Sequence, residues 1–233
     1  MRQVVLDTET TGLDITQGHR VIELGAREII DRQLTDRCFH HYLQPDRDID
    51  WGAQAVHGIT RVFLQDKPRF ADIAGEFIAF IRDAELIIHN APFDVGFLDG
   101  ELKRLGPQWG RMQDYATIVD TLVMARTRYP GQKNTLDALC KRYRVDNSKR
   151  DLHGALLDAE ILARIYLVMT GGQISLALET PRPRMPDDWF DPANAKGKRP
   201  PPRVIRATPE ELAAHTARLA AIDKASGGKC LWK

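Results

Sequence analysis

Apolar residues recur along the first 170 residues with two periods, which predict strands and helices in alternation. Short apolar runs typical of buried strands occupy residues 4–6, 20–30, 39–43, 86–88 and 118–122. Apolar positions at helical spacing predict helices over residues 70–81, 92–102, 135–143 and 154–169. Residues 44–66 show neither period and are expected to form a loop. The order βββαβαβαα predicts an α/β domain whose mixed sheet has antiparallel early strands.

The first predicted strand, Val4–Leu6, leads directly into two carboxylates, Asp7 and Glu9. Residues i and i+2 of an extended segment point to the same side, so these side chains project together. Two ionised carboxylates in a partly buried place repel each other unless a cation lies between them. Hard divalent cations prefer such oxygen ligands. Because Asp, Thr and Gly are also turn residues, this stretch alone leaves a metal site and a solvated turn open.

The composition is typical of a soluble globular protein and does not indicate a nucleic-acid or membrane partner. The 233 residues are 43% hydrophobic and 28% charged, which is ordinary for a soluble globular protein, and the formal net charge is +1. Three scattered cysteines without a CxxC pair predict neither a disulfide framework nor a zinc site. We expect a cytoplasmic protein, since no signal peptide precedes the first strand and no apolar run is long enough to span a bilayer.

The composition changes after Gly172. Residues 181–202 hold seven of the 13 prolines, which predicts an extended linker. Thr208, Pro209 and Glu211 then form the capping signature of a helix N-terminus. This helix carries only a narrow apolar stripe, made of Leu212, Leu219 and Ile222. We therefore expect three parts, over residues 1–172, 173–207 and 208–233.

Three further polar residues follow predicted elements of the first part. Asp94 stands at the entry of a helix, and Asp158 lies inside the helix that starts near Gly154. His153 precedes Asp158 by five residues, which would place the two roughly 140° apart on a helix. His153 therefore reaches Asp158 only if it lies at or before the helix N-terminus. Taken singly, Asp94 also fits a helix-capping acid and Asp158 a solvated helix face.

Taken together, these residues resemble the DEDD exonucleases that carry a histidine, within the RNase H-like superfamily. The shared motifs are D-x-E-T-T-G from Asp7, H-N-A-x-F-D ending at Asp94, and H-x-A-x-x-D from His153 to Asp158. More narrowly, the chain resembles the family of proofreading epsilon subunits of bacterial DNA polymerase III. The stretches that carry this resemblance are residues 56–59, 134–140, 146–150, 152–159 and 230–232.

The resemblance implies an RNase H-like exonuclease fold, with a five-stranded mixed sheet flanked by helices and an extended C-terminal tail. It also implies a metal-dependent 3′–5′ exonuclease that removes mispaired 3′-terminal nucleotides of DNA as 5′-monophosphates. Two divalent cations, Mg²⁺ or Mn²⁺, would be held by Asp7, Glu9, Asp94 and Asp158. His153 would take a proton from the attacking water. The residues expected to contact substrate are Asp7, Thr8, Glu9, His57 and Asp158, and for His57 a loop histidine satisfied by backbone remains the alternative.

The resemblance implies partners as well. Gln173, Leu176 and Leu178 look like a sliding-clamp-binding peptide, although the same apolar residues would also suit packing against the domain. The replicative polymerase is expected to bind the C-terminal segment, including Leu231-Trp232. A small accessory subunit is left open. The expected location is the bacterial cytoplasm, in association with the nucleoid.

One departure and two alternatives qualify this picture. The family often has Pro-Glu where this chain has Trp51-Gly52, so no substrate role passes to Gly52 and the hold on the 3′ end is expected to be weaker. An RNA-trimming exonuclease of the same fold is one alternative, because the motif does not distinguish ribose from deoxyribose. A scaffold that bridges clamp and polymerase is the other. Arg126, Arg128 and Lys133 fit either a phosphate contact or a solvated helix face.

Overall fold

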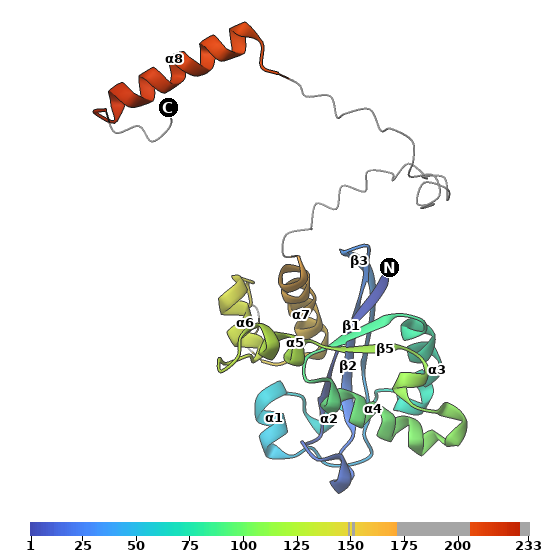
Figure 1. The fold of residues 1–233 in the computed structure, drawn as a ribbon. Helices are drawn as coiled ribbons and strands as arrows, with labels where there is room; N and C mark the ends of the chain where they lie inside the picture. The colour runs from blue at the N-terminus through green and yellow to red at the C-terminus, as the bar shows by residue number, and fades with distance from the viewer. Residues whose placement is uncertain (149, 151, 172–205, 229–233) are drawn as a thin grey trace, which may run out of the picture. The chain divides into compact units, whose positions relative to one another are not determined.

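The computed structural model describes residues 1–148, 150, 152–171 and 206–228 (Figure 1). The chain divides into two units, Met1–Leu176 and Ala177–Lys233. The predicted clamp-binding residues Gln173, Leu176 and Leu178 lie outside the described residues, as does Leu231-Trp232. Within the described part of the chain, no helix combines the length and apolar character needed to cross a membrane.

The first unit is built on a five-stranded sheet in the order β3-β2-β1-β4-β5. Its strands are β1 (Arg2–Thr10), β2 (Val21–Ile30), β3 (Gln33–Tyr42), β4 (Glu85–Ile88) and β5 (Thr117–Asp120). The pairs β1–β2 and β2–β3 are antiparallel, whereas β1–β4 and β4–β5 are parallel. The predicted mixed sheet with antiparallel early strands is therefore confirmed.

Helices cover both faces of this sheet (Figure 1). One face packs on α3 (Phe70–Ile81) and α4 (Ala91–Leu105). The other carries α5 (Thr121–Arg128), α6 (Leu136–Tyr143) and α7 (Ala155–Thr170). Alternation along β1 explains the two cores, because Val4 and Leu6 belong to the first and Val5 to the second. Two short helices and three 3₁₀ turns complete the unit: α1 (Trp51–His57), α2 (Arg61–Leu64), Ile15–Gln17, Pro107–Trp109 and Met112–Asp114.

Several predicted boundaries are wrong, for physical reasons. The first strand does not end at Leu6, because Asp7 and Glu9 pair across the sheet with Gly25 and Glu23 of β2. The third strand begins at Gln33, well before the apolar run that predicted it. Residues 44–66 are not a loop throughout, since α1 and α2 lie within them. These helices bury only one residue each and so leave no apolar period in the sequence.

The end of the fifth strand also differs from the prediction. That strand was expected to continue to Leu122, but the structure ends it at Asp120. The Asp120 side chain caps α5 by accepting hydrogen bonds from the backbone N–H groups of Leu122 and Val123. An aspartate before an apolar run is thus a helix start here.

The described part of the second unit contains α8 (Pro209–Ala225). Its predicted capping box is present, with Thr208 accepting from the Glu211 N–H and Glu211 accepting from the Thr208 N–H. No residue of α8 is buried, and Leu212 is 55% exposed. The local sequence determines where this helix begins, and no residue of its apolar stripe is more than half-buried.

Candidate active site

The N-terminus of α7 approaches the sheet where β1 carries Asp7 and Glu9. Gly25 of β2 lies opposite Asp7, and an added Cβ there would meet the backbone nitrogen of Leu156 at 2.2 Å. Only a glycine therefore allows the first turn of α7 to lie against β2 at this position. This close approach brings Asp158, which lies in that turn, to the end of β1.

Four carboxylates from three elements gather at this place. Asp7 and Glu9 come from β1, Asp94 from the first turn of α4 and Asp158 from the first turn of α7. Asp94 and Asp158 are each only 3% exposed. The Thr8 hydroxyl donates a 2.7 Å hydrogen bond to Asp94 Oδ1, which fixes this carboxylate against β1. All four acids of the predicted set therefore lie in one site.

Burial and mutual repulsion disfavour ionisation of these acids. Loss of solvent, followed by the charges of Asp94, Glu9 and Asp158, raises the pKa of Asp7 well above its ordinary value. Burial is also the main reason that the pKa of Glu9 rises to about 8. Burial raises the pKa of Asp94 to about 7, although the hydrogen bond from Thr8 works against it. Within the described part of the chain, the acids of the site thus carry more negative charge than nearby basic groups neutralise.

Among the described residues, Arg150 brings a positive charge into contact with these acids. Its side chain is 6% exposed and binds both oxygens of Asp158, with Nε–Oδ1 at 2.5 Å and Nη2–Oδ2 at 2.6 Å. It also contacts Asp137 of α6 at 2.7 Å. Burial alone would raise the pKa of Asp158, but hydrogen bonds from His153 and Arg150 lower it below its ordinary value.

Arg150 is a site residue that sequence reasoning missed. It stands inside a stretch that carried the family resemblance, but no motif marks it as a partner of Asp158. An ion pair between a loop and a helix leaves no periodic signal in the sequence. The available hint is its position three residues before His153.

His153 lies immediately before α7, as its spacing from Asp158 required. Gly154 is the N-cap residue of the helix, and the His153 N–H donates to the Val56 carbonyl of α1 at 3.2 Å. Its Nδ1 lies 3.4 Å from Asp158 Oδ2 and 2.9 Å from Arg150 Nη2. Ligand atoms of Glu9, His153 and Asp158 all lie within 4.8 Å of one another. The imidazole, 44% exposed in its side chain, is thus beside the acids and open to solvent.

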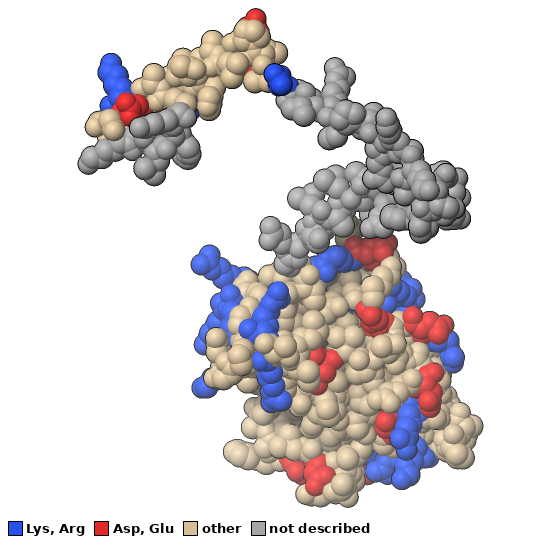
Figure 2. Space-filling model, viewed as in Figure 1, with Lys and Arg blue, Asp and Glu red and all other residues tan. Residues whose placement is uncertain are grey.

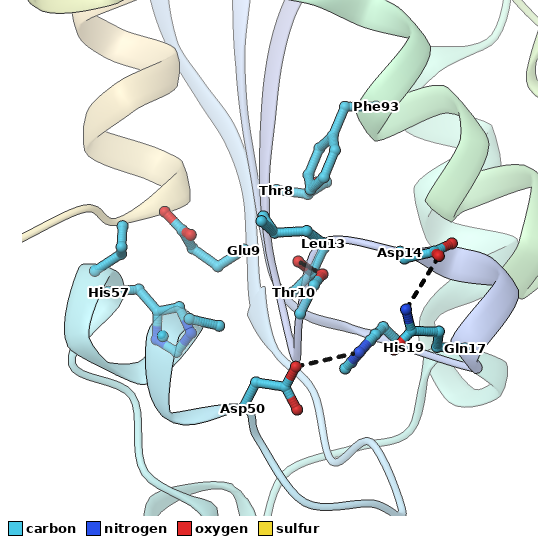
Figure 3. A pocket seen from close by; sticks show the side chains of 14 residues that line it. Thr8, Glu9, Thr10, Leu13, Asp14, Gln17, His19, Asp50, His57 and Phe93 are labelled. Carbon is cyan, nitrogen blue, oxygen red and sulfur yellow. Dashed lines mark hydrogen bonds and ion pairs between the residues drawn. The ribbon is translucent and has the colours of Figure 1, made fainter.

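A cleft of about 420 Å³ opens next to the carboxylates (Figure 3). Glu9 and His57 line it on one side and Phe93 of α4 on another, with Leu13 between them. Its floor includes His19, which contacts Asp50 at 3.3 Å and Thr11 at 3.0 Å. The full lining is Thr8, Glu9, Thr10, Gly12, Leu13, Asp14, Gln17, His19, Asp50, Gly52, Ala53, Val56, His57 and Phe93.

The predicted substrate residues divide into two groups. Thr8, Glu9 and His57 line this cleft, whereas Asp7 and Asp158 do not. His57 is buried, and its Nδ1 accepts a hydrogen bond from the Ile59 N–H at 3.0 Å. Its Nε2 has no hydrogen-bond partner among the described residues, and burial lowers the pKa of the ring. His57 therefore combines a backbone-satisfied nitrogen with a second, unpartnered one.

Two other positions complete the surroundings. Gly52 lines the cleft, and an added Cβ there would meet no atom within 4 Å, so a longer side chain has room. Glu23 lies across the sheet from Glu9 and contributes to the raised pKa of Glu9. Glu23 Oε1 is 2.7 Å from His40 Nε2, while its buried Oε2 has no partner within the described part of the chain. Glu23 was not predicted as a site residue. The sequence signal that could have identified it is an acidic residue between apolar residues of a predicted strand.

The donor set fits divalent cations. In the residues that the structure describes, four carboxylates stand against the guanidinium of Arg150, and oxygen-rich sites of this kind suit Mg²⁺ or Mn²⁺. Bound cations would remove the repulsion that raises the pKa of Asp7 and Glu9.

Comparison with known proteins agrees with this geometry. A family profile described as Exonuclease matches residues 4–166. The chain is 50% identical over 240 residues to the DNA polymerase III subunit epsilon of Escherichia coli K12, covering 100% of this chain and 97% of that protein. The chain belongs to the family of DNA polymerase III epsilon subunits. Another member of the epsilon family, from Rickettsia felis, is 53% identical over 175 residues and covers 75% of this chain and 76% of its own length.

Solved structures support the fold of this epsilon-family chain. It is similar to Exonuclease X in complex with 5′ overhanging duplex DNA, with a TM-score of 0.56 and 27% identity over 73% of this chain and 92% of that one. Escherichia coli Exonuclease I in complex with a dA16 oligonucleotide gives a TM-score of 0.63 at 19% identity, over 74% of this chain and 41% of that one. The latter likeness concerns the fold alone. The predicted RNase H-like exonuclease fold is confirmed.

Proposed function

We infer that the chain is a metal-dependent 3′–5′ exonuclease that proofreads DNA for a bacterial replicative polymerase. The observation that carries this inference is the convergence of Asp7, Glu9, Asp94 and Asp158 beside His153, at the edge of a cleft. Membership in the epsilon family supports DNA as the substrate. The product is a nucleoside 5′-monophosphate released from the 3′ end.

The four carboxylates are the proposed cation ligands. Mg²⁺ or Mn²⁺, when bound, would neutralise phosphate charge and activate water for in-line displacement. Asp7 lies near the other three acids, since its pKa responds to the charge of each of them. Thr8 orients Asp94 through its hydroxyl, and Arg150 orients Asp158 through both of its oxygens. Asp94 and Asp158 are thus held by neighbours before any cation arrives.

His153 is the proposed general base. His153 Nδ1 lies 2.9 Å from Arg150 Nη2 and 3.4 Å from Asp158 Oδ2, and these two contacts hold the ring beside the acids. Because the imidazole is 44% exposed and lies beside the carboxylates, it would be placed to take a proton from a water molecule at the cation site.

The cleft beside Glu9 is the proposed place of the 3′-terminal nucleotide. Phe93 and Leu13 offer apolar contacts to a base, and Thr8 and His57 lie on its walls. This lining does not select one base over another, and a proofreading enzyme must accept any of the four bases. Selectivity then follows from the ease with which a mispaired end unpairs and reaches the site, because unpairing costs least at a mismatch.

Incubation with a 3′-labelled mispaired primer tests this function. With Mg²⁺, the purified chain should release labelled 5′-monophosphate, and should release it faster from a mispaired end than from a paired one. Excess EDTA should stop the reaction. Equal release in EDTA, or none with Mg²⁺, would refute the proposal. A higher rate on a matched RNA oligonucleotide would favour an RNA-trimming enzyme instead.

The partners follow from the second unit and the segment before it. We propose that α8 binds the catalytic subunit of the polymerase, because no residue of its apolar stripe is buried: Leu212 is exposed, and Leu219 and Ile222 are half-buried. A sliding-clamp contact through Gln173, Leu176 and Leu178 is proposed from the sequence, since these residues lie outside the described ones. With the polymerase tethered, even a weak clamp peptide gains from its high effective concentration. The proposed location is the bacterial cytoplasm at the nucleoid, and a small accessory subunit stays a prediction.

A further inference from the structure

The strongest charge asymmetry of the first unit lies on α5, α6 and their connection. Residues 121–144 contain six basic side chains and one acidic one, although the whole chain has a net charge of only +1. Figure 2 shows Lys and Arg gathered at the left of the view, where α5 and α6 lie, whereas both signs are interspersed towards the right. We call this the α5–α6 surface, and its basic residues are Arg126, Arg128, Lys133, Lys141, Arg142 and Arg144.

Most of these charges are available to a ligand. Within the described ranges, no carboxylate lies within 4.0 Å of the charged nitrogens of any of the six. Arg126, Lys133, Lys141 and Arg144 are exposed. Arg128 differs from these four, since its guanidinium donates to the Met169 carbonyl.

Arg142 has a different role, because its hydrogen bonds stabilise the segment of residues 132–134. It donates to Asn134 Oδ1, Gln132 Oε1 and the Lys133 carbonyl at 2.9–3.0 Å. Its guanidinium also lies 4.2 Å from the centre of the Tyr129 ring. The segment that carries Lys133 is therefore fixed by side-chain contacts, so less conformational freedom is lost when a ligand binds it.

This surface adjoins the carboxylate site at two places. A second cleft of about 430 Å³ is lined by Asn90, which immediately precedes α4, and by Arg126 of α5. Asp94 and Phe93, in the first turn of the same helix, belong to the carboxylate set and to the first cleft. On the other side, α6 is tied to the site because Asp137 contacts Arg150. The carboxylates therefore lie between the cleft of the terminal nucleotide and the α5–α6 surface.

A scissile phosphate joins the terminal nucleotide to the rest of its strand, so the strand must leave the carboxylates on the side away from the first cleft. We propose that the α5–α6 surface binds the phosphate backbone of the DNA strand on the 5′ side of the scissile phosphate. This inference rests on the proposed exonuclease function. Phosphate contacts by Lys and Arg are independent of sequence, which suits an enzyme that must accept any 3′ end.

Two matched double substitutions in the full chain test the proposal. Arg126→Gln with Lys133→Gln removes two exposed charges beside the second cleft. Lys103→Gln with Arg104→Gln makes the same change in net charge in the last turn of α4, at the opposite end of that helix from Asp94. Each protein is assayed with Mn²⁺ on thymidine 5′-(p-nitrophenyl phosphate), which has no 5′ strand, and on single-stranded DNA of about 12 nucleotides.

The α5–α6 variant should hydrolyse the nucleotide ester at the wild-type rate. On the oligonucleotide its KM should rise about tenfold. The slope of log affinity against log salt should fall by about 1.4, because each neutralised phosphate of a single strand contributes about 0.7 to that slope. Anisotropy of a labelled oligonucleotide in Ca²⁺ measures the same weakening without turnover. The Lys103/Arg104 variant should match the wild type in every assay.

Wild-type KM and salt slope in the α5–α6 variant would overturn the proposal, and so would an equal loss in the control variant. If the wild type hydrolyses neither substrate, the proposed function fails. The anisotropy comparison still decides the surface in that case. Loss of polymerase binding with an unchanged KM would assign the surface to a protein partner, and would also overturn the inference.

Discussion

The helices α7 and α8 are nearly equal in length, with 16 and 17 residues, yet they are stabilised in opposite ways. α7 buries nine residues, including Asp158, against the sheet and α6. None of the residues of α8 is buried. Helix propensity and capping alone give marginal stability in water, so a helix of this length usually needs a packed face.

The two helices suit two different tasks: α7 positions a residue of the site, and α8 is suited to binding another protein. α7 lacks a side-chain cap at Gly154 and relies on burial, and this rigid packing holds Asp158 against Glu9 and His153. α8 has a full capping box and an apolar stripe of which no residue is buried. The first arrangement suits a catalytic ligand that must not move, and the second suits a segment that completes its packing on another protein.

The largest expected effect is on kcat and comes from removing His153, the proposed general base beside α7. His153→Ala should lower kcat by 100-fold or more, about the usual contribution of a general base. Mn²⁺ affinity should change little, because the four carboxylates remain. Rates of mispaired-primer excision measure the first quantity, and calorimetric Mn²⁺ titration measures the second. His215→Ala in α8 is the control, and an unchanged kcat in His153→Ala would remove this residue from the mechanism.

The next effect concerns the stripe of α8. Leu219→Glu with Ile222→Glu should weaken polymerase binding by about 100-fold, since each buried apolar side chain contributes about 1.5 kcal/mol or more. Exonuclease activity on the primer should stay at the wild-type level. Ala217→Glu with Ala221→Glu places the same charges on the opposite side of the helix. Equal binding by both variants would show that the stripe is not the contact.

Because the pKa of Glu9 is raised, the free energy of unfolding of the wild type should depend on pH differently from that of Glu9→Gln. In the metal-free protein the folded state favours the protonated acid, so its ionisation lowers stability as pH rises from the unfolded value near 4.5 towards about 8. Glu9→Gln cannot ionise, and its stability relative to the wild type should therefore increase between pH 5 and pH 8.5, by about 4 kcal/mol.

Denaturant unfolding in EDTA at the two pH values gives this difference. Saturating Mn²⁺ should reduce it, because a cation neutralises the ionised acids of the wild type. Glu210→Gln in α8 lies in the other unit and serves as the control. A difference that shrinks as pH rises would contradict the assigned direction of the Glu9 pKa.

The smallest effect concerns the departure at Trp51-Gly52. Gly52→Glu would place a carboxylate in open space on the cleft wall, where the family resemblance puts a contact to the terminal 3′-hydroxyl. We expect KM for a DNA 3′ end to fall about threefold, within the range of one hydrogen bond. Substrates with a 3′-deoxy end provide the control, because they should gain nothing. A raised KM would show that the added charge repels the strand.

The sequence predicts most of the sheet and the longer helices, because their apolar residues are periodic. The helix over residues 70–81 has the same bounds in the structure as in the prediction. The short α1 and α2 were missed, since one buried residue each makes no period. β1 was cut short at Leu6 because charged residues rarely lie inside a buried strand.

In the site, too, residues that belong to a sequence pattern were predicted and residues without one were missed. Asp7, Glu9, Asp94, Asp158 and His153 were found because ordered motifs carry them. Their proximity is a property of the fold, which needs Gly25 to admit the first turn of α7. Arg150 and Glu23 were not assigned a role, since their contacts join distant elements and leave no local pattern. Motif reading thus finds the proposed ligands and misses the residues that contact them.

The number of Mn²⁺ ions bound by the full chain tests the central claim, that four converging carboxylates form the cation site. Calorimetry or spin resonance should count two ions in the wild type. Asp7→Asn, which keeps the size of the side chain but removes a charge that interacts with the other three acids, should lose this binding while the protein stays folded. Wild-type stoichiometry and affinity in Asp7→Asn, or no bound ion in the wild type, would contradict the account.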